Sequence, residues 1–426
     1  RIASESLLKK MRDTPNLTVY PAGPNDGGGL CECEVCAQWD TPGYLEPSSG
    51  KPAAGDRIFQ FGNELAKITS QTQPTKDLGI LIYSEYSRPP VKLESINPNI
   101  FPMFAPIRRC RLHGPGHPGC AWGKLWADEI MDWGTRTHKL GFYIYNYNLA
   151  DTLLPLAKVT YYKDLQRVMH EAKAEQTAWI FETIDAWAVH APHLWLSVRL
   201  AWDSHIDIDA EMARYYRGFY GAAAVPMARY WTRVDEAYAN SPTHTGSSYG
   251  QHQIWTPELL RACRADLNEA LKLAANPREQ EAVAMANAGL GFAETFRRLW
   301  DGLVTADFLA AGQAQEELRS TIAGLVSKTD PCWVHERYTY GYYKRFLGET
   351  VTGGEKLLKD GGEILVKFPD KWRFSKDEQA VGVAKEWFQP AFDDTQWGEL
   401  ATFSKSWDDQ GLSTYYGDAW YRLSFA

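Results

Sequence analysis

The chain has 426 residues, of which 44% are hydrophobic and 23% charged, and its formal net charge is −8. This length indicates roughly two to four domains, and the composition is that of an ordinary globular protein. The acidic balance argues against a nucleic-acid-binding protein, whose footprint is basic, and no apolar run is long enough to span a bilayer.

Residues 1–200 alternate between apolar runs and helical patterns. The predicted strands are Leu17–Tyr20, Leu78–Tyr83, Ile100–Ala105, Leu140–Tyr145 and Thr177–Phe181. The predicted helices are Asp56–Thr69, Lys124–Gly134 and Thr160–Ala174. Near-continuous apolar strands separated by helices indicate a parallel sheet covered on both faces. We expect the last five strands of a (β/α)8 barrel over residues 1–204, with a doubly wound sheet as the alternative.

The rest of the chain changes character twice. Residues 205–330 are Ala-rich, with charges four apart, and predict a helical domain with helices Ile208–Tyr220, Ala222–Asn240, Thr256–Ala275, Pro277–Val304 and Phe308–Lys328. Residues 331–369 form a connecting segment with an expected hinge at Gly353-Gly354. Residues 370–426 predict the start of a truncated β-sandwich from strand-like pieces at Lys371–Phe374, Glu386–Phe388, Phe392–Trp397 and Gly417–Arg422. The chain begins at Arg1 and ends within such a pattern, so we interpret it as a piece of a longer protein.

Polar side chains follow each predicted strand of the first region. In chain order they are Asn25 and Asp26, Tyr83 and Glu85, Arg108 and His113, Tyr145, Asn146 and Tyr147, and finally Glu182 and Trp187. In a parallel barrel these positions share the carboxyl-terminal rim, where the chemistry takes place. Two carboxylates with amides, hydroxyls and aromatic rings are what a glycosidase needs. The chain is also rich in rings, with 17 Trp and 22 Tyr, which suits either sugar stacking or large cores.

Each acid also has an ordinary interpretation. An Asp before Gly, as at Asp26, is usually a turn former, and Glu85 alone suits a solvated or ion-paired residue. Glu182 is different, because it directly follows the apolar run Ala178–Phe181, where a charged side chain is unexpected unless it has a functional role. We therefore expect Asp26 and Glu182 to be the catalytic pair.

Five of the seven cysteines, Cys31, Cys33, Cys36, Cys110 and Cys120, lie in the first third of the chain. Together with His113 or His117 they can build a structural Zn site. Alternatively, they form disulfides between the loops after the first and third strands, as suits an exported enzyme. We favour a structural role of either kind over a catalytic metal, and we expect no catalytic cofactor.

The segment Pro24–Cys36, followed by Asp56–Asn63, resembles the bacterial domain of unknown function 4838, which includes glycoside hydrolase family 163. Further matches follow in order at Arg108–His113, Tyr145–Tyr147, Phe181-Glu182, Trp202-Asp203 and Tyr220-Gly221. The resemblance covers roughly residues 15–235. The tail, from Phe392 to Arg422, resembles the opening of the galactose-binding-like sandwiches appended to many glycosidases.

The resemblance implies a (β/α)8 barrel and an endo-β-N-acetylglucosaminidase that works through the 2-acetamido group of its own substrate. It implies a glycan or polysaccharide partner and a periplasmic or extracellular location. Tyr145-Asn146-Tyr147 stands where the family usually has an Asp-Tyr pair, so a hydrolase for another sugar, such as a uronide, is an alternative. Two further alternatives are a non-catalytic carbohydrate-binding or scaffold protein and a metal-dependent enzyme built on the cysteines.

Overall fold

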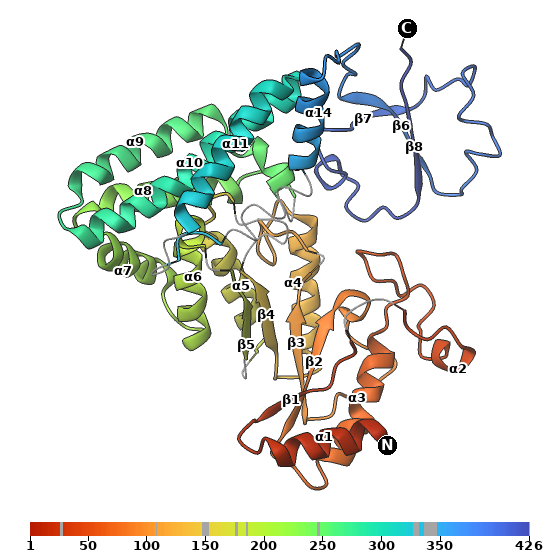
Figure 1. Ribbon diagram of the computed structural model, residues 1–426. Coiled ribbons are helices and arrows are strands. Elements are labelled where there is room, and N and C mark those ends of the chain that lie inside the picture. The colour runs from red at the N-terminus through yellow and green to blue at the C-terminus, as the bar shows by residue number, and fades with distance from the viewer. Residues whose placement is uncertain are drawn as a thin grey trace.

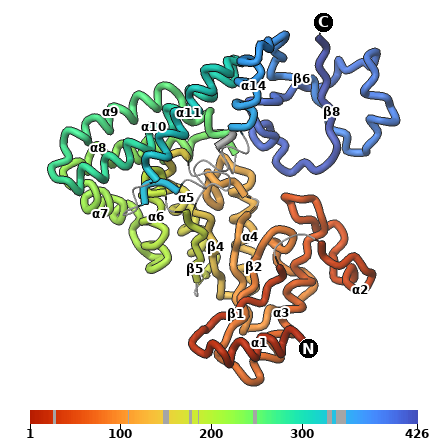
Figure 2. Tube along the Cα trace, viewed as in Figure 1, coloured from red at the N-terminus to blue at the C-terminus, as the bar shows by residue number. Residues whose placement is uncertain are grey.

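A computed structural model of the chain describes residues 1–25, 29–107, 109–146, 153–174, 178–184, 186–244, 248–326, 332–335 and 347–425. Figure 1 shows a parallel sheet with its helices, a group of long helices and a separate antiparallel sheet near the C-terminus. The Cα trace passes through these three parts in chain order (Figure 2).

The parallel sheet has five strands in the order β1-β2-β3-β4-β5. They are β1 (Val19–Pro21), β2 (Asp77–Tyr83), β3 (Ile100–Ala105), β4 (Gly141–Tyr145) and β5 (Trp179–Glu182). All neighbouring strands are parallel and the sheet is curled, so the architecture is a partial TIM-type barrel and the prediction is confirmed. The register sets Tyr83 opposite Ala105 and Tyr145 opposite Glu182, which brings the carboxyl ends to one edge.

One face of this sheet is buried in the main core. In β2, Leu78, Ile80 and Ile82 are buried, whereas Leu81 and Tyr83 on the opposite face are half-buried. The core also contains side chains from α1 (Ile2–Asp13), α3 (Gly55–Thr69), α4 (Ala121–Gly134), α5 (Val159–Glu171) and α6 (Trp187–Trp202). A short helix, α2 (Glu34–Ala37), lies in the long loop after β1. The opposite, half-buried face of the sheet is therefore available to line a binding pocket.

Among the described residues, five further α-helices follow α6 in the part of the chain where the sequence predicts a helical domain. They are α7 (Ile208–Tyr220), α8 (Ala224–Ala239), α9 (Pro257–Leu273), α10 (Pro277–Thr305) and α11 (Phe308–Val326). The predicted hinge at Gly353-Gly354 is wrong, because both glycines lie inside α14 (Glu349–Lys359). Gly354 allows α14 to approach α11, since a Cβ there would come within 2.3 Å of the Phe308 ring.

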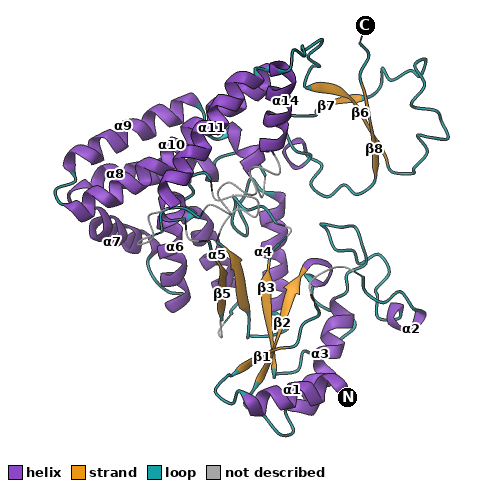
Figure 3. Cartoon of the chain, in the orientation of Figure 1, coloured by secondary structure: helices purple, strands orange, loops and turns teal. Residues whose placement is uncertain are grey.

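The C-terminal sheet is antiparallel, with strand order β7-β6-β8 (Figure 3). Its strands are β6 (Lys371–Asp377), β7 (Gly398–Ala401) and β8 (Asp418–Arg422). The predicted strand pieces at Glu386–Phe388 and Phe392–Trp397 are wrong: these residues form turns in which Trp387 packs against Phe392 and Trp397. Aromatic residues that pack together in a loop thus give a sequence pattern similar to that of a β-strand. A complete sandwich, a galactose-binding fold and the domain boundaries stay predictions.

The segment after β7 contacts both other parts. Trp122 Nε1 donates to Asp408 Oδ1 at 3.0 Å, and Gln253 Nε2 donates to the Ser404 carbonyl at 2.6 Å. The ring of Phe403 stacks on Trp300 with centroids 5.2 Å apart. Across the ranges that the structure describes, no helix combines the length and apolarity that crossing a membrane requires.

Candidate active site

Glu182 ends β5 at the carboxyl edge of the parallel sheet and is half-buried. Its Oε2 accepts a hydrogen bond of 2.8 Å from the Tyr143 hydroxyl on the neighbouring strand β4. Burial, and then this bond to Glu182, raises the pKa of Tyr143 to about 12. The phenol therefore keeps its proton at neutral pH and acts as a donor to the carboxylate.

Glu182 lines a pocket of about 350 Å³ on the half-buried face of the sheet. Four tyrosines dominate this barrel pocket, and its complete lining is Pro24, Leu81, Tyr83, Tyr86, Ile107, Tyr143, Tyr145 and Glu182. Tyr145 and Ile184 form a small apolar cluster apart from the main core, and Ile107 and Tyr143 pack against it. Phenol rings and one carboxylate can therefore contact a ligand together.

Two cations lie behind Tyr145. The Arg111 guanidinium lies over the Tyr145 ring, 4.2 Å from its centroid, and the Lys158 ammonium lies 3.4 Å from the Tyr145 carbonyl oxygen. Burial raises the pKa of Tyr145, in spite of Arg111. Burial, and then the charge of Arg111, lowers the pKa of Lys158 to about 7. This edge of the sheet therefore combines a neutral phenol with a buried lysine close to its titration point.

A second pocket, of about 470 Å³, adjoins the barrel pocket, because Pro24 and Tyr86 line both. Asn25 and Glu85 line this second pocket, together with Cys31 and Glu32. Glu85 accepts a 2.6 Å hydrogen bond from the Ser84 hydroxyl. Four of the residues predicted to bind substrate are thus divided between two neighbouring pockets: Tyr83 and Tyr145 line the barrel pocket, and Asn25 and Glu85 line the second.

Three other predicted residues lie away from the lining of either pocket. Asn146 is buried, and its side chain bonds with Ser197 Oγ at 2.9 Å and with the Tyr162 hydroxyl. Its backbone N–H donates to the Glu182 backbone carbonyl at 3.0 Å, so it helps to hold the backbone at the end of β5. Trp187 begins α6 and packs against the core. His113 is buried beside Cys110, and its sugar contact, like that of Trp187, stays a prediction.

Three of the predicted site residues, Asp26, Arg108 and Tyr147, lie outside the described residues. Asp26 directly follows Asn25, which lines the second pocket. The catalytic role of Asp26 and the binding roles of Arg108 and Tyr147 stay predictions.

The cysteines do not form the single cluster or the disulfides expected from the sequence. The seven cysteines all lie among the described residues, and the structure records no disulfide between them. Cys31, Cys33 and Cys36 form one exposed group, whereas Cys110 and Cys120 gather with His113 and His244 in another. The two groups separate because the first lies in the loop after β1 and the second beside the start of α4.

Sequence reasoning missed Tyr143, Arg111, Lys158 and His244. Tyr143 had a usable signal, because it stands two residues before Tyr145 and so shares its face of β4. His244 had no such signal, since it lies 124 residues after Cys120 in an irregular segment.

A search of curated proteins found no match. Among solved structures, the chain is similar to a GH138 enzyme targeting pectin rhamnogalacturonan II, with 11% identity and a TM-score of 0.37. The likeness covers 76% of this chain and 56% of that one, so this chain spans little more than half of its length. A family model, Domain of unknown function (DUF4838), matches residues 1–233. Because this match takes in more than half of the 426 residues, the protein belongs to the DUF4838 family.

Proposed function

We propose that the protein is a retaining glycoside hydrolase in which Glu182 is one of the two working carboxylates. One observation carries the proposal: Glu182 ends a strand at the carboxyl edge of the sheet, lines a pocket with four tyrosines and is held by Tyr143. In barrel enzymes this edge is where catalysis takes place. A carboxylate with hydroxyls and rings is suited to protonating or stabilising a sugar while packing on its faces.

The substrate in this proposal is a glycan or polysaccharide with β-linked N-acetylglucosamine, as the resemblance to glycoside hydrolase family 163 implies. The acetamido oxygen attacks C1 as the C1–O bond to the leaving sugar breaks, and a carboxylic acid protonates the leaving oxygen. Water then attacks C1 of the oxazolinium ion, losing its proton to the same carboxylate, and the configuration is retained. Glu182 and Asp26 divide the two roles, acid/base and stabiliser of the oxazolinium ion.

The test is hydrolysis of a chitobiose-containing glycan by the full-length protein, followed by mass spectrometry of the products. Glu182→Gln and Asp26→Asn should each lower kcat by about 100-fold or more, since each removes a proton donor or a charge at the reacting centre. The matched control is Glu171→Gln, because Glu171 ends α5 at the opposite edge of the sheet.

Normal turnover by Glu182→Gln would show that Glu182 is not one of the two carboxylates. A wild-type chain that binds the glycan but releases no product would instead support the non-catalytic carbohydrate-binding function. Hydrolysis of a uronide but not of the chitobiose glycan would support the proposed glycosidase activity and contradict the proposed substrate.

A further inference from the structure

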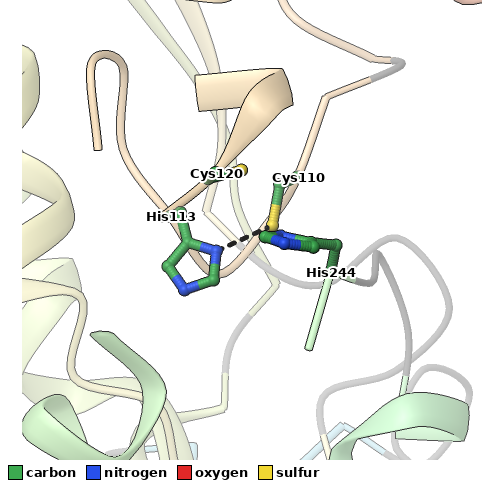
Figure 4. Close-up of side chains that lie close together, drawn as sticks. All are labelled: Cys110, His113, Cys120 and His244. Carbon is green, nitrogen blue, oxygen red and sulfur yellow. Dashed lines mark hydrogen bonds between the residues drawn. The ribbon is translucent and has the colours of Figure 1, made fainter. Parts of the chain in front are cut away.

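Four metal-ligating side chains meet where the parallel sheet, the long helices and the C-terminal part come together. Cys110 and His113 lie in the loop after β3, Cys120 directly precedes α4, and His244 lies in the segment after α8. Their ligand atoms all lie within 4.8 Å of one another. Figure 4 shows the four side chains converging, with Cys110 next to both imidazole rings.

We propose that Cys110, His113, Cys120 and His244 bind one Zn²⁺ as a structural centre. Around a tetrahedral Zn²⁺, a sulfur and a nitrogen ligand stand about 3.6 Å apart, given the usual Zn–S and Zn–N bond lengths. Cys110 Sγ and His113 Nδ1 are 3.4 Å apart, which already matches that edge. Every pair of ligand atoms lies within 4.8 Å, so the other separations need to close by no more than about 1.5 Å to reach the edges of a Zn²⁺ tetrahedron.

The donor set selects the metal and the type of site. Two thiolates with two imidazoles in a tetrahedral arrangement are typical of Zn²⁺. Four protein ligands close the coordination sphere, so the ion has no open position for a substrate. Zn²⁺ displaces the two thiol protons, and the complex of one dication, two thiolates and two neutral imidazoles carries no net charge. A neutral centre suits this place, because Cys110, His113 and Cys120 are buried.

The surrounding backbone holds the ligands in place. Cys120 is the N-cap of α4, and its Sγ accepts a 3.2 Å hydrogen bond from the Gly123 N–H, which favours a thiolate there. The backbone N–H of His244 donates to Asp409 Oδ1 at 2.7 Å. His244 Nδ1 is buried without a hydrogen-bond partner among the described residues, so a metal bond there would satisfy an otherwise unpaired atom.

The centre would also fix the segment that carries Arg109 and Arg111. Arg109 forms a buried ion pair with Glu129 at 2.7 Å, and Arg111 lies over the Tyr145 ring at the barrel pocket. Both arginines stand between the ligands Cys110 and His113 or next to them. The ion would therefore stabilise the rim of the pocket without touching a substrate.

The group formed by Cys31, Cys33 and Cys36 is the competing metal site. It offers three sulfurs, two of them on exposed residues, and no imidazole. The two groups share no residue, so substitutions separate them cleanly.

The direct experiment measures zinc in the full chain after purification and removal of loosely bound metal. We expect about one Zn²⁺ per chain, and less than one tenth of that in Cys110→Ser and Cys120→Ser. His244→Ala should also lose the metal, and this half-buried position is the least damaging to the fold. The controls are Cys263→Ser, a buried cysteine in α9, and His117→Ala, whose ring stacks on His113 without joining the four; both should retain full occupancy.

A second measurement needs no variant. Replacing Zn²⁺ by Co²⁺ should give strong tetrahedral d–d bands and a thiolate charge-transfer band, and chelation of the zinc protein should lower the unfolding temperature. A wild-type chain that remains metal-free after incubation with Zn²⁺, or a weak octahedral Co²⁺ spectrum, would overturn the proposal. Zinc that persists in Cys110→Ser but disappears when Cys31, Cys33 and Cys36 are replaced by Ser would overturn it too. None of these readouts depends on hydrolysis, so the zinc centre and the proposed glycosidase stand or fall separately.

Discussion

The Tyr143 hydroxyl donates a 2.8 Å hydrogen bond to Glu182 Oε2, and this bond crosses from β4 to β5. The register sets Tyr145 opposite Glu182, so Tyr143 is the diagonal neighbour of the carboxylate, within reach of a long side chain. Because the Tyr143 pKa is raised to about 12, by burial first, the bond persists across the neutral range. Tyr143 therefore orients the carboxylate at the edge of the sheet.

Replacing Tyr143 by Phe keeps the ring and removes only the donor. A hydrogen bond to a charged group contributes about 1.5–3 kcal/mol, so kcat/KM should fall roughly 10- to 100-fold if Glu182 takes part in the reaction. The matched control is Tyr216→Phe in α7, on a buried tyrosine of the helical region. In a Glu182→Gln background, Tyr143→Phe should have little further effect, because the two side chains act together. Full additivity of the two losses would contradict this coupling.

The strands of the parallel sheet could be predicted to within two residues at each end, because each strand is an apolar run bounded by turns. Ile100–Ala105, for example, is buried along its whole length, as a central strand should be. Helix α6 could not be predicted in this way, since it is apolar on nearly all sides and includes Pro192. A helix without a polar face gives no periodic signal. Its identity as a helix depends on packing against α5, α7 and α10, which is a property of the tertiary structure.

The candidate site could be predicted in part. Tyr83, Tyr145 and Glu182 follow from the rule that strand ends share an edge, and all three line one pocket. Arg111 could not be placed in this way, because its contact with Tyr145 depends on the path of the loop after β3. Likewise, only the folded chain brings His244 to Cys110.

The buried ion pair of Arg109 and Glu129 makes a prediction about stability. Arg109 Nη2 lies 2.7 Å from Glu129 Oε1, and its Nη1 lies 3.5 Å from Glu46 Oε1. Arg109→Met leaves two buried carboxylates without this cation, which should cost about 3–5 kcal/mol in the free energy of unfolding at pH 8. Urea denaturation measures this loss. Lys124→Met, which breaks the exposed pair with Asp128, should cost less than about 1 kcal/mol.

The same variant should respond to pH in a defined direction. Burial raises the pKa of Glu129 even with Arg109 present. A carboxyl with a raised pKa in the folded state binds protons more readily than in the unfolded chain, so stability increases as pH falls through that range. The deficit of Arg109→Met should therefore shrink between pH 8 and pH 5. A deficit that grows on acidification would contradict the role of Glu129.

Lys158 gives the opposite pH dependence. Its pKa falls from 10.5 to about 7 through burial and then the charge of Arg111. Between these two pH values the unfolded chain binds more protons than the folded chain, so the free energy of unfolding rises with pH. Below pH 7 the folded chain carries the full destabilising effect of the buried charge. Lys158→Met should raise Tm by roughly 5–10 °C at pH 6 and have much less effect at pH 10. Lys163→Met, five residues later and exposed, should show no such dependence.

Two neighbouring glycines of α14 give a prediction with a built-in control. A Cβ on Gly354 would come within 2.3 Å of the Phe308 ring, whereas a Cβ on Gly353 would meet nothing within 4 Å. Both lie inside the helix, where Ala is favoured over Gly by about 1 kcal/mol. Gly353→Ala should therefore raise the free energy of unfolding by up to about 1 kcal/mol. Gly354→Ala should lower it by about 1–3 kcal/mol, because overpacking against α11 outweighs the helix propensity. A hinge at these glycines would give a similar change in the free energy of unfolding for both variants. Changes of opposite sign, measured by urea denaturation, would instead show that Gly354 is required for packing of α14 against α11.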